Sequence, residues 1–479
     1  MIILKNAISF IAIWGSQIII LIANLLTQAI LTRSFFPADY GKFVSALSIV
    51  SIFATLASFG ISQYWLKIFG REGLTAYRWM KYSRYLLLVS TILAIIGCLL
   101  FVSFTGNQEV FKYTLYLVPI IIYTAIYSLL TSIFQLSRQY IKMSIFQTFM
   151  PVLKLVTAFF IAYIFVEELK LIAMGYSVIS LILILMSLKY YIKFINKKIP
   201  LLEYEKIEYK ITKKSLNFRL FLKEVSPYGF LGFFYLIYYQ IDVFMINTFN
   251  LSENAAYYSV AISILSAIYV FPTAIYQRFF GPQIHKWVYH DVKKVMAFHK
   301  IGNDVMILLS AFIIFGIGIF GEMIIVWIFG ENYKFSYEIL ILLTFSIPFR
   351  LLGNNMGTIF NTGNYVNSKL IIQGTAAVFN VMLNFVLLKT IGLYGAITAT
   401  IFTELYVWWS FKIVYSKKQK LSLRLSRRSI VPILFLLLTY LIFLVPEGWN
   451  LMLFITGWIF IFIILVRKFI KRYYLTQHE

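Results

Sequence analysis

The chain has 479 residues and is both strongly hydrophobic and strongly basic. Hydrophobic residues make up 61% of it and charged residues 13%, mean hydropathy is +0.82, and 43 Lys and Arg against 19 Asp and Glu give a formal net charge of +24. A water-soluble protein of this composition would need a far larger core than a chain of this length forms. The composition therefore excludes a soluble globular protein and indicates an integral membrane protein.

Fourteen stretches are long and apolar enough to cross a bilayer, which takes about 20 residues of helix. The apolar runs are continuous, whereas the strands of a membrane barrel alternate in hydrophobicity, so we expect an all-α fold. The thirteenth stretch is the shortest. The predicted spans are residues 8–31, 40–61, 83–104, 113–135, 146–166, 169–191, 226–248, 256–278, 304–328, 337–361, 369–389, 393–415, 430–445 and 450–467.

Most of the Lys and Arg residues fall in alternate loops and in the tails. Basic residues are retained on the cytoplasmic side during insertion, so this distribution predicts that both termini are cytoplasmic. The charges are scattered beside span ends, where anionic lipid headgroups are the natural neighbours. We therefore expect membrane lipids, and no nucleic acid, as partners.

Two polar intervals divide the chain. They predict an N-lobe of six helices at 1–191, a cytoplasmic linker at 192–223, a C-lobe of six helices at 224–415, and two additional helices within 416–479. An even number of spans in each lobe makes the repeat parallel, with a pseudo-twofold axis along the membrane normal. Similarity between the lobes is weak, and chance likeness among apolar helices is the alternative. At an offset of 215 positions, Gly41, Phe43, Ala46, Ser48 and Ile49 face Ala256, Tyr258, Ala261, Ser263 and Ile264.

Motifs for catalysis or metal binding are absent from the sequence. A single cysteine, Cys98, excludes a disulfide framework or a thiolate metal site within one chain. There is no glycine-rich phosphate loop, and we place all four histidines in a cytoplasmic loop or tail. A membrane polymerase or glycosyltransferase would need a long outer loop for its active site, and the predicted outer loops are short. We expect no enzyme, no cofactor and no bound metal.

Several segments resemble the polysaccharide and O-antigen flippases of the multidrug/oligosaccharidyl-lipid/polysaccharide exporter superfamily. The resemblance runs over roughly residues 5–415, and the final two spans fit that family's fourteen helices. It is clearest between Asn380 and Glu404. The segments that carry it are Leu31–Gly41, Tyr239–Asp242 with Ala256–Ala261, Gly330–Tyr333, and Asn380–Asn384 followed by Gly392–Thr400 and Glu404.

This resemblance implies a flippase. Such a protein moves a polyprenyl-diphosphate-linked oligosaccharide, an O-antigen or other surface polysaccharide repeat unit, from the cytoplasmic to the outer leaflet by alternating access. It also implies a bacterial or archaeal cytoplasmic (inner) membrane, and other membrane proteins of polysaccharide assembly as further partners. The diphosphate makes unassisted crossing very slow, and a wet, cationic cavity would shelter it.

Charges inside the predicted spans are the first candidates for the substrate site. They are Lys154, Asp242, Arg350 and Glu404. A charge at the bilayer centre costs about 2.5–3.5 kcal/mol on insertion scales, so each should face the interior or a partner. Lys154 and Arg350, one in each predicted lobe, are expected to bind the diphosphate together. The alternative is that Arg350 forms a buried ion pair with Asp242 or Glu404, and these two carboxylates are also candidates for ion coupling.

Further candidates lie at span ends and on the eleventh span. Arg33, Lys67 and Arg71 would line the mouth of the cavity, or else reach toward lipid headgroups. Asn380 and Asn384, four residues apart on one helix face, would bind sugar hydroxyls or a neighbouring helix.

A competing function is efflux of small cationic molecules on the same superfamily fold. Such a pump would need acidic residues in its cavity, and Asp242 and Glu404 keep that function open. The basic pair and the closer motif likeness favour an anionic, lipid-linked glycan.

Overall fold

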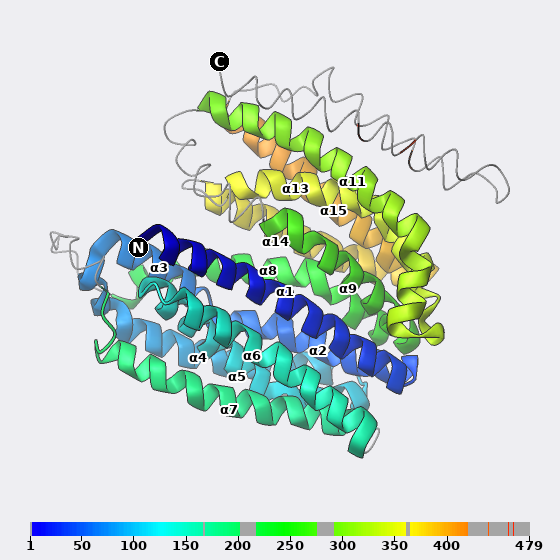
Figure 1. Ribbon diagram of the computed structural model, residues 1–479, viewed down its shortest axis with the longest axis horizontal. Helices are drawn as coiled ribbons and strands as arrows, with labels where there is room; N and C mark the ends of the chain where they lie inside the picture. Colours follow the sequence, from blue (N-terminus) through cyan, green and yellow to red (C-terminus); the bar gives the residue numbers. More distant parts are fainter. Residues whose placement is uncertain are drawn as a thin grey trace. The chain divides into compact units, whose positions relative to one another are not determined.

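The computed structural model describes residues 2–165, 168–201, 217–274, 292–360 and 365–419, with the isolated positions 439, 458 and 463. All regular structure within these ranges is helical (Figure 1), which confirms the all-α fold class. The predicted spans at 430–445 and 450–467 lie, apart from the isolated positions, outside the described residues.

Each of the first twelve predicted spans coincides with a helix, or with a pair of helices, over its described residues. The principal helices are α1 (Ile2–Ser34), α2 (Pro37–Ser58), α3 (Ile61–Glu72), α4 (Met80–Ser103), α5 (Gln108–Leu136), α6 (Tyr140–Phe160), α7 (Leu169–Ile195), α8 (Phe218–Thr248), α9 (Ser252–Ala274), α11 (Val292–Phe329), α12 (Ser336–Leu343), α13 (Ile347–Ile359), α14 (Val366–Ile391) and α15 (Leu393–Gln419).

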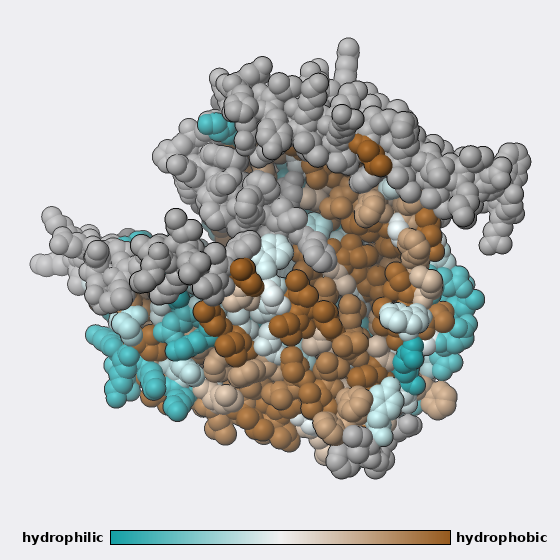
Figure 2. Space-filling view, in the orientation of Figure 1, coloured by the Kyte–Doolittle hydropathy of each residue, from teal (hydrophilic) through white to brown (hydrophobic). Residues whose placement is uncertain are grey.

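The described helices have the surface of a membrane protein. In this part of the chain, nine helical stretches are long and apolar enough to cross a bilayer, with the segment from Pro37 to Ser103 counted as one. Large apolar side chains such as Leu88, Leu185 and Trp327 are exposed. On the face seen in Figure 2, hydrophobic side chains cover the middle lengths of the helices, and hydrophilic ones gather near helix ends. Lipid, rather than water, would solvate this band.

Helix packing divides the chain into two compact units. Unit 1 comprises 1–260, 328–333 and 373–396, and unit 2 comprises 261–327, 334–372 and 397–479. In unit 1, α5 packs against α2 and α7, α1 packs against α6, and α2 also packs along α8. The lobe boundaries 1–191 and 224–415 stay a prediction, because these units follow contacts between helices and not an internal repeat.

A short amphipathic helix replaces the loop expected between the second and third spans. In α3, apolar residues recur every three or four positions, so that Ile61, Trp65 and Phe69 fall on one face and are fully buried. The opposite face carries Lys67 and Arg71. A 3-10 turn at Gly73–Trp79 then leads into α4.

Helix α2 ends in a turn that brings two backbones together. Phe59 and Gly60 both adopt left-handed conformations, with φ of 39° and 69°. A Cβ atom on Gly60 would lie 2.4 Å from the Gly229 backbone nitrogen in α8. Only glycine fits there, since both the dihedral and the close approach exclude a side chain.

The opposite end of α2 makes an equally close approach. A Cβ atom on Gly41 would lie 1.7 Å from the Ser252 carbonyl oxygen and 3.3 Å from the Ala256 backbone nitrogen. Gly41 and Ala256 are the positions that the offset of 215 pairs. One close approach does not test the internal repeat, which stays a prediction.

Two local predictions were wrong. The predicted span 226–248 would place Pro227 in the first turn of its helix, but α8 begins at Phe218, where the Asn217 side chain accepts a hydrogen bond from the Leu220 backbone N–H at 2.7 Å. Pro227 therefore interrupts the interior of α8. The tenth span was predicted as one helix, but a 3-10 turn at Thr344–Ser346, just before Pro348, separates α12 from α13.

Candidate functional site

Lys154 lies in α6 with its ammonium nitrogen 4.8 Å from the ring centroid of Tyr176 in α7. The structure gives it no carboxylate partner among the described residues. The Tyr176 side chain is 1% exposed, and its hydroxyl group has no hydrogen-bond partner there. An ammonium group within a membrane helix and a buried phenol that both lack acceptors among the described residues are costly, so the pair is suited to an anionic or hydroxyl-bearing ligand.

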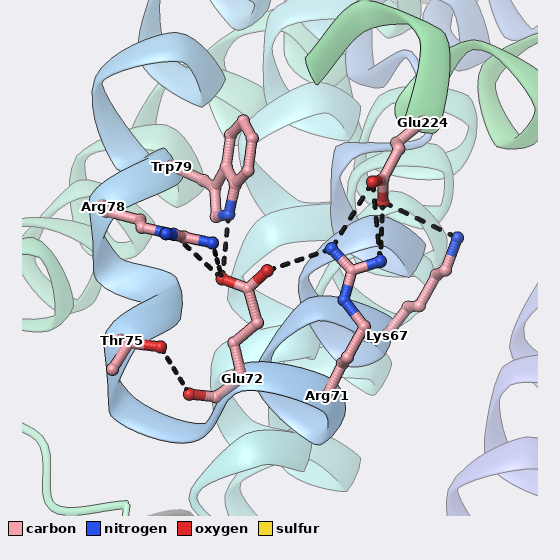
Figure 3. Close-up of polar contacts among 7 residues, drawn as sticks. All are labelled: Lys67, Arg71, Glu72, Thr75, Arg78, Trp79 and Glu224. Atoms are coloured by element: carbon pink, nitrogen blue, oxygen red, sulfur yellow. Dashed lines mark hydrogen bonds and ion pairs between the residues drawn. The ribbon is translucent and has the colours of Figure 1, made fainter. Parts of the chain in front are cut away.

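Glu72 at the end of α3 is the centre of a buried ionic cluster (Figure 3). Its carboxylate accepts hydrogen bonds from Arg71 at 3.0 Å, from Arg78 at 2.9 and 3.0 Å, and from the Trp79 indole nitrogen at 3.1 Å. The side chain is completely buried, and these donors satisfy both of its oxygens. Glu72 therefore fixes the turn between α3 and α4.

Glu224 of α8 lies on the other side of Arg71 (Figure 3). Its oxygens are 3.4 and 3.5 Å from the Arg71 guanidinium nitrogens and 3.8 Å from the Lys67 ammonium nitrogen. Lys67 also lies over the Tyr228 ring, one turn further along α8, at 5.6 Å. The two predicted cations Lys67 and Arg71 thus share one carboxylate and join α3 to α8 in unit 1.

Arg33 at the end of α1 is exposed, and its Nε donates a hydrogen bond to the Ile328 carbonyl oxygen at 3.0 Å. Ile328 lies in the last turn of α11, where carbonyl groups lack partners within the helix and favour a cation. The structure therefore gives Arg33 a contact with a helix end.

Arg350 of α13 forms a buried ion pair with Glu404 of α15 in unit 2. The shortest nitrogen–oxygen distance is 2.6 Å, and both side chains are less than a tenth exposed. The guanidinium also lies 5.8 Å from the ring centroid of Tyr269. This is one of the two arrangements that the sequence left open for Arg350. Lys369 in α14, which the sequence reasoning missed, lies within electrostatic range of Arg350.

Asp242, Asn380 and Asn384 meet in a buried polar cluster within unit 1. Asp242 of α8 accepts hydrogen bonds from the Tyr258 hydroxyl at 2.8 Å and from the Asn384 amide at 2.7 Å. The Asn384 amide also points at the Asn380 carbonyl oxygen, 3.0 Å away. Neither asparagine is exposed to solvent. In this structure Asn384 joins helix α14 to α8 and also contacts Asn380 within α14.

The four histidines were predicted to lie in a cytoplasmic loop or tail, and for His299 the structure shows a helix instead of a loop. His299 belongs to α11 and is 4% exposed, because that helix begins earlier than the hydropathy pattern indicates. The Asn355 amide of α13 donates to the His299 carbonyl oxygen at 3.1 Å and to Asn303 at 2.7 Å. The i, i+4 spacing of His299 and Asn303 is the sequence signal that would have shown a polar helix face.

The structure therefore places the predicted residues other than Arg33 in four groups. Lys154 stands with Tyr176, Lys67 and Arg71 stand with Glu224, and Asp242 stands with the two asparagines, all in unit 1. Arg350 and Glu404 stand together in unit 2. Among the described residues, no three His, Cys, Asp or Glu side chains are grouped so as to hold a metal ion.

The fold is shared with solved membrane transporters. A structure described as "Lipid II flippase MurJ, inward closed conformation" matches with a TM-score of 0.67 at 14% identity, over 99% of this chain and 100% of that one. An inward-facing multidrug resistance transporter of the MATE family matches with a TM-score of 0.58 at 13% identity, over 84% and 96%. A transporter from Pyrococcus furiosus, described as having a binding pocket of reverse polarity, matches with a TM-score of 0.51 at 14% identity, over 87% and 96%.

These similarities define the class of the protein, a multi-pass membrane protein with the fold of the MATE and MurJ transporters. Residues 3–286 match the polysaccharide biosynthesis protein family, which is more than half of the chain. The chain belongs to this family, and the predicted resemblance is confirmed. Among curated protein sequences, none matches.

Proposed function

We propose that the protein is a flippase for a polyprenyl-diphosphate-linked oligosaccharide. The substrate is an O-antigen or other surface polysaccharide repeat unit, carried from the cytoplasmic to the outer leaflet of a bacterial or archaeal inner membrane. Transport proceeds by alternating access through a cationic cavity, and both termini are cytoplasmic. Family membership supports the glycan pathway, and the fold supports transport rather than catalysis.

Lys154 is the observation that carries this proposal. A lysine in a membrane helix that has an aromatic ring beside it and no carboxylate partner among the described residues is unfavourable unless it binds a ligand. The ammonium group suits one phosphate oxygen of a diphosphate, and the neighbouring Tyr176 hydroxyl suits a second oxygen or a sugar hydroxyl.

Arg350 has a different part in the proposal. Its charge is balanced by Glu404, so a diphosphate has to compete with that carboxylate or bind the remaining guanidinium N–H groups. Lys369 adds a second cation in the same unit. Asp242 and Glu404 are the proposed positions for ion coupling, because an intramembrane carboxylate that changes charge or partner can link transport to a cation gradient.

Reconstitution tests the function directly. Purified protein in proteoliposomes is supplied with a fluorescent polyprenyl-diphosphate oligosaccharide, and the fraction that becomes accessible to a reagent in the opposite leaflet is followed with time. We expect transport by the wild type, strong loss in Lys154→Met, and wild-type transport in Lys142→Met. Lys142 is the matched control, since it lies exposed in the first turn of the same helix.

The same vesicles distinguish the proposed function from efflux of cationic drugs. Uptake of a cationic dye with no movement of the lipid-linked oligosaccharide would overturn the proposal in favour of a drug pump. Loss of mature surface polysaccharide on gene deletion, with accumulation of the lipid-linked precursor, checks the function in the cell and shows whether other assembly proteins depend on it.

A further inference from the structure

The polar cluster between α3 and α8 contains two carboxylates with very different surroundings. Glu72 is completely buried and receives hydrogen bonds of 2.9–3.1 Å from Arg71, Arg78 and Trp79 (Figure 3). Glu224 is 22% exposed, and its contacts with Arg71 and Lys67 are all between 3.4 and 3.8 Å. Charge-assisted hydrogen bonds of good geometry are about 2.7–2.9 Å long. Glu224 is therefore loosely bound.

The cations that hold Glu224 are accessible. The Lys67 side chain is 43% exposed and that of Arg71 is 42% exposed. They stand four residues apart on the outer face of α3, so both side chains reach the same spot. Arg71 also contacts the fully buried Glu72 at 3.0 Å, and this contact orients the guanidinium group before a ligand binds.

Cations outnumber carboxylates among the described residues of this cluster. Three cations, Lys67, Arg71 and Arg78, lie within ion-pair distance of Glu72 or Glu224. An arginine fork and a lysine point charge side by side match a diphosphate better than they match one carboxylate, since a diphosphate has more acceptor oxygens and more charge.

We propose that Lys67 and Arg71 form a capture site for the diphosphate headgroup of a lipid, and that Glu224 occupies this site as an internal substitute anion until the headgroup displaces it. This inference rests on the proposed function and names the place where the substrate is first bound. The positive-inside distribution puts the cluster on the cytoplasmic side, where the lipid-linked substrate is made available.

Displacement of Glu224 would have a mechanical consequence. Besides the ionic contacts, α8 is held at this end of α2 by the backbone approach of Gly60 to Gly229 and by Lys67 over Tyr228. Release of Glu224 removes the ionic part of the connection between α3 and α8. Binding of the headgroup and loosening of this end of unit 1 are then one event, as expected for a ligand that selects a more open state.

The test measures binding of geranylgeranyl diphosphate to the full chain in phosphatidylcholine nanodiscs. The Glu224 carboxylate competes with the diphosphate for the two cations, so Glu224→Gln should bind geranylgeranyl diphosphate more tightly than the wild type. We expect an increase in affinity of roughly two- to fivefold, which corresponds to the free energy of an exposed ion pair. Arg71→Gln should bind several-fold more weakly, and Arg71→Lys should retain part of the affinity. Lys81→Gln, an exposed cation in α4 outside the cluster, should bind as the wild type does.

If the contact of Glu224 with Lys67 and Arg71 were only a structural ion pair, Glu224→Gln would not bind geranylgeranyl diphosphate more tightly than the wild type. If Glu224→Gln binds the diphosphate as the wild type does or more weakly, the inference is overturned. Equal affinity for inorganic pyrophosphate would assign the site to a soluble diphosphate, and equal competition by phosphatidylglycerol in the nanodisc would assign it to bulk anionic lipid. Either result overturns capture of a lipid diphosphate.

Two readouts keep this inference separate from folding and from the proposed function. In a Cys98→Ala background, spin labels at Gln63→Cys and Arg219→Cys, both exposed positions on α3 and α8, should move apart when geranylgeranyl diphosphate is added. Unchanged distances would contradict the displacement. Transport loss in Lys154→Met tests the flippase independently, so a working flippase whose Glu224→Gln variant binds no more tightly refutes only the capture site.

Discussion

Lys154 and Arg350 are both cations within membrane helices, but their surroundings differ. Arg350 is paired with Glu404 at 2.6 Å, whereas Lys154 has the Tyr176 ring beside it and no described carboxylate within ion-pair distance. A paired buried charge fixes the packing of the helices that carry its partners. An uncompensated one lowers stability, and such a cost is usually retained where a ligand supplies the missing charge. This difference is why we propose a ligand-binding role for Lys154 and a structural role for the Arg350 pair.

Breaking the Arg350 pair should have the largest effect on stability. In Arg350→Met the Glu404 carboxylate is left buried without its cation, and we expect a loss of about 3–5 kcal/mol. Thermal unfolding in detergent would measure it. The double variant Arg350→Met/Glu404→Leu should recover most of that loss, and a double variant as unstable as the single one would show that the pair does not fix α13 against α15.

Removing Lys154 should have the opposite effect on stability. We expect Lys154→Met to unfold at the same temperature as the wild type or higher, because a cation within a membrane helix is replaced by an apolar chain of similar length. Its transport should fall by about 10- to 100-fold, the value of one charge-assisted hydrogen bond. A strongly destabilised Lys154→Met that still transports would reverse the comparison.

Asn384 offers a third case, a neutral donor to a buried carboxylate. Asn384→Leu removes one of the two described donors to Asp242, and we expect destabilisation of about 1–3 kcal/mol. If the variant is as stable as the wild type but binds the oligosaccharide less well, Asn384 belongs to the sugar site. The dependence of transport on sodium concentration in Asp242→Asn then shows whether this cluster couples an ion.

Lys67 should give the smallest change in stability. Its contact with Glu224 is long and exposed, so Lys67→Gln should cost only about 0.2–1 kcal/mol, and salt should reduce the difference further. Unfolding at low and high ionic strength measures both effects. A loss as large as that of Arg350→Met would mean that the α3–α8 contact is a fixed structural element.

The sequence predicts the helices well because crossing a bilayer requires a long apolar run, a property that each segment carries by itself. The sequence predicts helix bounds incorrectly where a helix extends beyond its apolar run or contains too few apolar residues. Asn217 caps α8 well before the apolar run begins, and α3 has too few apolar residues to look like a span although its buried face is helical. The extension of α11 back over His299 was missed for the same reason.

The sequence does not predict which side chains on different helices form ion pairs or hydrogen bonds with one another. It does identify Lys154, Asp242, Arg350 and Glu404 as unusual, because charged residues are rare within membrane spans. It did not decide which of them pair, because residues such as Arg350 and Glu404, or Asp242 and Asn384, meet only through helices that are distant in the chain. It also passed over Glu72 and Glu224, which look like ordinary loop charges until α3 folds against α8.

Hydropathy and basic loops thus determined by themselves that this is a helical membrane protein, and the motifs around Tyr40, Asp242 and Asn380 determined its family. The tertiary structure alone decided that Arg350 is neutralised, that Lys154 is not neutralised by any described residue, and that Glu224 occupies the Lys67 and Arg71 pair. The physical reason is the distance along the chain over which each effect acts. Bilayer insertion acts on each segment separately, whereas charge compensation depends on distances of a few ångströms between segments.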